Sequence, residues 1–254
     1  MMSIQKNGKR GLMKMNKKEK ALFLGHFILL LLELLVVLHA FSEEGWTTLR
    51  FYTTDSNFLC GIASLLYILK KFPKLNQEGK GVVSGYFQKK QQAGISLEEE
   101  RPSLITLLRF ISTASLMVTF VVVLLVLGPE NGYAHEFLGG MRLYSHLICP
   151  FLSLFLFVTG EERVPKKWIS YALYATLLYA IPLILLNATG LVSGPYSFLK
   201  IREQSLGKTM FWIVTILSGN ALLAWGAIGL QGLKVGLKKR RDKEQIDKEQ
   251  IEID

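Results

Sequence analysis

The chain has 254 residues, half of them hydrophobic, with a mean hydropathy of +0.30 and a formal net charge of +10. A soluble domain would spread its apolar residues at the period of a helix or strand, whereas here they form long blocks. Crossing ~30 Å of hydrocarbon takes about 20 apolar residues in an α-helix, and several blocks reach that length. The basic residues cluster at the block ends, as in cytoplasmic loops of membrane proteins. We therefore expect membrane lipids as partners and no nucleic acid.

The two cysteines of the chain, Cys60 and Cys149, both fall inside apolar blocks. This position predicts packing residues rather than a disulfide framework or a Cys-rich metal site. We accordingly expect neither a metal nor a cofactor.

The first apolar block, residues 21–41, follows a basic N-terminal tail, residues 1–20. The block is too long for the apolar part of a signal peptide and lacks a clear cleavage site, so it predicts a retained transmembrane helix. The short acidic loop 42–45 comes next. The second block, residues 53–70, opens with an unusually polar run, and the long polar segment 71–103 follows it.

Four further apolar blocks complete the predicted transmembrane region, which extends over residues 21–233. They cover residues 104–127 (closed by Gly128 and Pro129), 137–159, 168–186 and 209–233. The charged tail 234–254 contains the repeat Asp-Lys-Glu-Gln-Ile, which predicts a disordered or frayed helical end.

The charge of the connecting segments alternates along the chain. Both tails and the loops after the second and fourth blocks are basic, whereas the loops after the first and third blocks are neutral to acidic. The positive-inside rule then predicts an all-α bundle of six transmembrane helices with both termini in the cytoplasm. The loop after the fifth block fits the alternation imperfectly, because it carries Lys200, Arg202 and Lys208.

Ionisable side chains inside the predicted helices mark candidate sites, because such groups are costly in lipid and usually face the bundle interior. The first block contains Glu33, which we interpret as a structural or cavity-lining acid. Arg109 and Arg142 are expected to extend to the interface or to pair with Glu33 or Asp55. Further ionisable residues in or beside the blocks are His26, His39, His135 and His146, of which His26 and His135 are expected at the membrane interfaces.

The predicted topology brings several polar residues to the outer half of the bundle. The polar run Thr53-Thr54-Asp55-Ser56-Asn57 begins a helix that runs inward, and His39 ends a helix that runs outward. His146 follows the start of the fourth helix by about nine residues, or roughly 13 Å. If the second helix has already begun at Thr53, then Thr53, Ser56 and Asn57 share one of its faces. These positions predict a site that opens toward the outer leaflet.

A hydroxyl beside a neutral imidazole is the minimum for nucleophilic attack on an acyl carbon. Asn57 or Ser145 could supply the donor that stabilises the oxyanion. The alternative interpretation is structural, because Ser and Thr in membrane helices often bond to their own backbone or to a neighbouring helix. Asp55 would then serve as an N-cap of the second helix.

Three segments, Phe51–Asn57, His146–Pro150 and Gly194–Leu199, resemble motifs of one family in their order and placement. This family comprises the androgen-induced and androgen-dependent membrane hydrolases of fatty-acid esters of hydroxy fatty acids, with their bacterial six-span relatives. The resemblance implies Thr53 as nucleophile and His146 as base. It also implies a lipid-ester substrate and a multi-pass protein of the bacterial plasma membrane.

Our candidate substrate or cavity residues are Asp55, Ser56, Asn57, Glu33, His39, Arg142 and Tyr196. The chain departs from the family pattern in a His-to-Pro interval that is one residue shorter and in Ser197, where proline is usual. Thr54 and Ser56 remain rival nucleophiles beside Thr53.

Three functions compete at this stage. The first is an intramembrane lipid-ester hydrolase that uses a threonine nucleophile. The second is a transporter or a binder of small molecules or lipids that uses the same polar residues without chemistry. The third is a structural or regulatory protein that acts through the segment 71–103.

Overall fold

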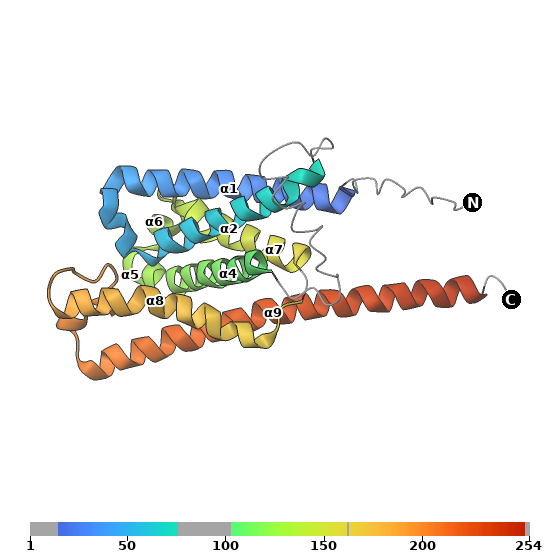
Figure 1. The fold of residues 1–254 in the computed structure, drawn as a ribbon. Helices are drawn as coiled ribbons and strands as arrows, with labels where there is room; N and C mark the ends of the chain where they lie inside the picture. Colours follow the sequence, from blue (N-terminus) through green and yellow to red (C-terminus); the bar gives the residue numbers. More distant parts are fainter. Residues whose placement is uncertain (1–14, 76–102, 162, 252–254) are drawn as a thin grey trace, which may run out of the picture.

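The computed structural model describes residues 15–75, 103–161 and 163–251, and every regular element in these ranges is helical. The long helices lie side by side in one bundle, and successive ones run in opposite directions (Figure 1). Four helical stretches in the described part of the chain are long and apolar enough to cross a membrane: Lys17–Arg50, Leu104–Asn131, Lys166–Ala188 and Leu206–Leu237. The predicted all-α class is therefore confirmed, and its membrane character is supported by four candidate spanning helices.

Helix α1 (Lys17–Glu44) begins four residues before the first predicted span because a capping box starts it. The side chain of Asn16 accepts a 2.8 Å hydrogen bond from the Glu19 backbone N–H, and the Glu19 carboxylate accepts one of 3.1 Å from the Asn16 N–H. These bonds satisfy two backbone donors that a helix start leaves free. The helix ends at Gly45, whose φ of +58° suits a residue without a Cβ.

Helix α2 (Tyr52–Leu75) packs against α1 and against α4 (Leu104–Val122). It begins one residue before Thr53, so the polar run occupies its first turns. Asp55 therefore lies within the first helical turn and is not the N-cap. The polar run also explains why α2 is absent from the four candidate spanning helices. Most of the predicted loop 71–103 lies outside the described residues.

The third helix continues past its predicted end at Leu127. A single π-helical turn, Val123–Leu127, follows α4, and the Gly128 N–H bonds to the Val123 carbonyl five residues earlier. Proline normally clashes with the carbonyl four residues before it. We attribute the continuation through α5 (Gly128–Asn131) to this wider turn, which makes room for the proline at the start of α5.

The predicted span 137–159 is divided into two helices. A short helix, α6 (Tyr133–Leu138), is followed by a turn at Gly139 and Gly140, where Gly140 has φ +55°. The longer helix begins only at residue 142, and it passes through a π-helical turn (Tyr144–Ile148) into α7 (Cys149–Gly160). The glycine pair ends α6 and turns the chain into the next helix. The structure therefore corrects the predicted start of this span.

The last two long helices are α8 (Ile169–Ala188) and α9 (Leu206–Ile251). Helix α9 extends through the charged segment to Ile251 and projects beyond the bundle (Figure 1). Of the two alternatives predicted for this tail, a disordered segment and a helical end, the structure has helix up to Ile251. The start of α1 and the far end of α9 lie at the same end of the bundle (Figure 1).

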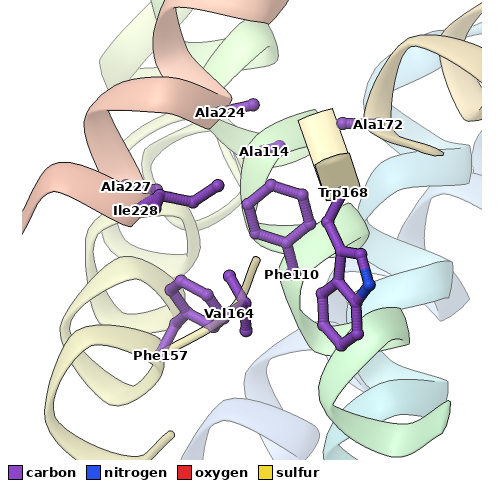
Figure 2. Packing of buried hydrophobic residues seen from close by; sticks show 9 residues of the cluster. All are labelled: Phe110, Ala114, Phe157, Val164, Trp168, Ala172, Ala224, Ala227 and Ile228. Carbon is purple, nitrogen blue, oxygen red and sulfur yellow. The ribbon is translucent and has the colours of Figure 1, made fainter. Parts of the chain in front are cut away.

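One apolar core joins α4, α7, α8 and α9 (Figure 2). Its alanines bring the helix backbones close together, as small residues do between membrane helices. The buried members are Phe110, Ala114, Phe157, Val164, Trp168, Ala172, Ala224, Ala227 and Ile228. Large apolar side chains on the outside, such as Leu178 with 77% of its surface exposed, suit contact with lipid rather than with water.

Candidate functional site

A mostly apolar cavity of about 290 Å³ lies at the end of the bundle where α2 and α9 begin and α8 ends. Side chains from α2, α4, α8, the segment 196–201 and α9 form its wall. The polar side-chain groups among the lining residues are the indole N–H of Trp212 and the hydroxyls of Tyr52, Thr53, Thr119, Thr176, Tyr179, Tyr196 and Thr209. A cavity of this lining suits an acyl chain whose polar end contacts the hydroxyls.

Thr53 meets Tyr196 at the wall of this cavity. The Tyr196 phenol lies beside the side chain and the backbone of Thr53 and beside the backbone of Tyr52. Its ring packs against Phe198, with 5.2 Å between centroids, and edge-on against Phe51. Burial raises the pKa of Tyr196 to about 12, against smaller opposing effects of the neighbouring Thr53 groups. Tyr196 is therefore a neutral hydroxyl at physiological pH and can donate a hydrogen bond.

The rival hydroxyls beside Thr53 are engaged elsewhere. Thr54 is buried and shares a 3.0 Å hydrogen bond with Thr48. Ser56 is also buried, lies 3.1 Å from the Thr119 hydroxyl and donates to the Thr53 carbonyl. Of the three candidate nucleophiles, Thr53 alone belongs to the cavity wall. This arrangement favours Thr53 over its neighbours.

Asn57 is fully buried one turn beyond Thr53. Its amide nitrogen donates a 2.7 Å hydrogen bond to the Thr53 carbonyl, and its Oδ1 has no hydrogen-bond partner in the described part of the chain. Ser145 donates to the Arg142 carbonyl. Neither side chain belongs to the cavity wall, whereas Tyr196 does, so Tyr196 is better placed than either to serve as an oxyanion donor.

His146 lies in the π-helical turn before Pro150, and a carboxylate supports it. Its Nδ1 is 2.7 Å from the Glu136 carbonyl and 3.9 Å from the Glu136 carboxylate, which also accepts a 2.8 Å hydrogen bond from Asn131. Because a carbonyl only accepts hydrogen bonds, Nδ1 carries the imidazole proton in the neutral form and Nε2 holds the free lone pair. That tautomer is the one a general base needs.

Glu136 does not stand out in the sequence as a site residue, because it lies in the acidic loop expected after the third span. It is buried, with 6% of its surface exposed. An acid ten residues before His146 carries no helical spacing signal. The pairing exists because the turn after α6 brings this short helix back against the π-helical turn.

Thr53 and His146 lie at the same depth in the bundle. Helices α2 and α7 run in the same direction, and Cys60 Sγ contacts Ser153 Oγ at 3.6 Å (Figure 1). Thr53 lies seven residues before Cys60, and His146 lies seven residues before Ser153, so both residues lie toward the same end of the bundle from this contact. His146 is nevertheless absent from the cavity wall.

The remaining candidate residues do not join this cavity. Glu33 is buried in the centre of the bundle, and neither of its oxygens has a hydrogen-bond partner among the described residues. His39 is exposed, although its Nε2 lies near Gly140. Asp55 is half-buried, and Arg142 donates to the His135 carbonyl.

A second polar group lies toward the opposite end of the bundle. Arg109 forms an ion pair with Glu161, rather than with Glu33 or Asp55, and Glu161 also accepts a 2.8 Å hydrogen bond from Thr106. His26 is buried, lies 3.4 Å from the Ser64 hydroxyl and stacks on Tyr67. His26, which we expected at a membrane interface, is therefore enclosed by neighbouring helices of the bundle.

Within residues 15–75, 103–161 and 163–251, no three His, Cys, Asp or Glu side chains come together as a metal site requires. No protein-family model, curated protein or solved structure matches this chain.

Proposed function

We propose that this protein is an intramembrane lipid-ester hydrolase with Thr53 as nucleophile and His146 as general base. One observation carries the proposal: a cavity-lining threonine stands at the same depth as a histidine whose Nδ1 is fixed by Glu136. The resemblance of three sequence motifs to the membrane ester hydrolases supports the same assignment. The apolar cavity would hold the acyl chain of the substrate.

In the proposed reaction, His146 Nε2 removes the proton from the Thr53 hydroxyl, and Thr53 Oγ attacks the ester carbonyl carbon. Tyr196 stabilises the resulting oxyanion, and its collapse breaks the ester bond, while His146 returns the proton to the leaving alcohol. Water then attacks the acyl-threonine with His146 again as base. The reaction requires Nε2 within about 3 Å of Oγ when substrate is bound.

We further propose six membrane crossings with both termini in the cytoplasm of a bacterial cell. Helix α2 and the helix 142–160 share the bundle with the four candidate spanning helices, and the two ends of the chain's helical part lie at one end of it (Figure 1). The loop charges favour the cytoplasm for that end.

A fluorophosphonate probe tests the nucleophile directly, because it labels activated hydroxyls covalently. Purified wild-type protein should hydrolyse a long-chain fatty-acid ester and take up the probe, and Thr53→Ala should abolish both. Thr54→Ala is the matched control, since Thr54 lies beside Thr53 but is absent from the cavity wall. Labelling that survives Thr53→Ala, or is lost equally in Thr54→Ala, would remove Thr53 as nucleophile.

A lipid-binding role without chemistry is the second candidate, and the absence of His146 from the cavity wall favours it. In that case the protein would retain a fatty-acid ester without cleaving it, and Thr53→Ala would leave the retained amount unchanged. A solute or proton path through the buried Glu33 belongs to the same class, and proton-coupled uptake into vesicles that depends on Glu33 would reveal it.

A further inference from the structure

The segment 196–203 is part of the connection between α8 and α9, and its side chains line two different cavities. Phe198, Leu199 and Ile201 line the apolar cavity described above. Lys200, Arg202 and Glu203 instead line a polar cavity of about 370 Å³, together with Asn187 in the last turn of α8 and residues that follow this helix. One short segment thus separates an apolar space from a charged one.

The charge in the polar cavity is predominantly basic. Lys200 forms an ion pair with Glu203 at 3.7 Å, whereas Arg202 extends its guanidinium over Gly190. A Cβ on Gly190 would collide with Arg202 Nη1, so this glycine, with φ +79°, leaves the space that the guanidinium occupies. Arginine presents several fixed donors and binds phosphate oxygens in pairs.

Lys200 and Arg202 are also the residues that fit the charge pattern of the loops poorly. In the proposed topology their loop faces outward, where basic residues are disfavoured relative to the cytoplasm. Basic pockets between transmembrane helices bind the head groups of anionic lipids on the cytoplasmic side, and the same pairing of arginine with phosphate oxygens is available to a pocket on the outer side. A ligand-binding role accounts for basic residues that the topology does not require.

We propose that the polar cavity binds the phosphate head group of an anionic glycerophospholipid, one of whose acyl chains occupies the apolar cavity. Arg202 and Lys200 contact the phosphate, and Phe198 and Ile201 contact the chain. The two cavities lie on either side of the same segment, whose consecutive Cα atoms are only about 3.8 Å apart. A lipid that occupies both must cross over this segment, with its phosphate on the basic side and a chain on the apolar side. The head-group contacts are separate from the role proposed for Thr53, because neither basic residue lines the apolar cavity. The acyl chain of the phospholipid, however, takes the space proposed for the acyl chain of the ester substrate, so the two lipids compete for this cavity.

Native mass spectrometry of the purified full chain in detergent tests this site. Dioleoyl phosphatidylglycerol and dioleoyl phosphatidylcholine are titrated separately, and bound lipid is counted. We expect tighter binding of phosphatidylglycerol, and we expect Arg202→Gln to weaken it about fivefold, the effect of roughly 1 kcal/mol per basic residue. Lys200→Gln should act in the same direction, and both variants should reduce the preference for phosphatidylglycerol over phosphatidylcholine, whose phosphate charge is balanced by its own choline.

Lys208→Gln is the matched control, because Lys208 is an exposed basic residue just beyond the segment that lines neither cavity. It should bind phosphatidylglycerol as the wild type does. Equal affinity for the two lipids, or equal weakening in Lys208→Gln and Arg202→Gln, would overturn the proposal. The same titration with Thr53→Ala separates the two roles, since retained lipid selectivity supports the head-group site whether or not ester hydrolysis is found.

Discussion

At the scale of single residues, the position of His146 depends on one buried acid. Glu136 supplies a backbone carbonyl at 2.7 Å and a carboxylate at 3.9 Å from the same imidazole nitrogen. The carbonyl selects the tautomer, and the carboxylate favours the imidazolium that forms when His146 accepts a proton. Asn131 in turn orients the carboxylate. Glu136 is therefore a positioning residue in the proposed hydrolase.

We expect Glu136→Gln to lower kcat for ester hydrolysis by about a hundredfold while leaving KM unchanged. The physical reason is loss of imidazolium stabilisation, within the range of 10²–10⁴ that a general base contributes. Steady-state kinetics on a long-chain ester measure the effect. Glu43→Gln, at an exposed position in the last turn of α1, is the control and should match the wild type. A rise in KM with constant kcat would contradict the positioning role.

Tyr196→Phe tests the oxyanion donor. Removing a single donor at an oxyanion costs roughly 10²–10³ in kcat, and the phenyl ring retains the packing against Phe198. We expect this loss in kcat with probe labelling of Thr53 reduced but still present. Tyr133→Phe, on an exposed tyrosine outside the cavity wall, should have no effect on kcat.

At the scale of single residues, the sequence indicates which residues could form a site but not which side chains contact one another. Thr53, Ser56 and Asn57 were predicted to share a helical face, and α2 is indeed helical from Tyr52. Contact of Tyr196 with Thr53 depends on a loop that returns over the bundle, and the Glu136 pairing depends on a turn. Neither contact leaves a periodic pattern in the sequence.

At the scale of elements, two π-helical turns stand directly before prolines. Val123–Leu127 precedes Pro129, and Tyr144–Ile148 precedes Pro150. The wider turn keeps each helix continuous where a proline would otherwise end or kink it. A 3.6-residue pattern does not reveal such turns, which is why the third helix was predicted to stop at Leu127. The apolar blocks themselves identified the long helices because block length depends only on composition.

Gly140→Ala should disturb the turn that places α6 against the π-helical turn. A residue with a Cβ at φ +55° costs roughly 1–2 kcal/mol. We expect a lower unfolding midpoint in mixed micelles and a loss of hydrolysis, because Glu136 would move away from His146. Gly219→Ala is the control: Gly219 lies within α9 with no atom near its added Cβ, so the change should be neutral or stabilising. Equal effects of the two substitutions would contradict this account.

The ion pair between Arg109 and Glu161 joins α4 to the end of α7. Arg109 is buried, with 3% of its surface exposed. Glu161→Gln should destabilise the protein by about 3 kcal/mol, because it leaves a buried charge unpaired. The double variant Arg109→Met with Glu161→Gln should recover part of that loss in an unfolding titration. A double variant less stable than Glu161→Gln alone would contradict this prediction.

At the scale of the whole molecule, the proposed six-helix topology is tested by cysteine labelling. Cys60 and Cys149 are buried, so the native cysteines should not react in intact cells. A membrane-impermeant maleimide should label Glu43→Cys and Lys208→Cys from outside, and Lys17→Cys only after lysis. Labelling of Lys17→Cys in intact cells would reverse the orientation. Labelling of Glu43→Cys and Lys208→Cys on different sides would exclude six crossings.

Helix α9 leaves the bundle at a fixed point, because Lys234 Nζ donates to the carbonyls of Val158 and Thr159. The part of the helix from Lys234 to Ile251 has 18 residues and is about 27 Å long. This projecting part of α9 would move as a rigid arm that pivots where Lys234 contacts the end of α7. A tilt of about 10° at Lys234 would displace Ile251 by about 5 Å. A fluorophore at Ile251 would thus magnify rearrangements at the base of α9 that are too small to follow inside the bundle.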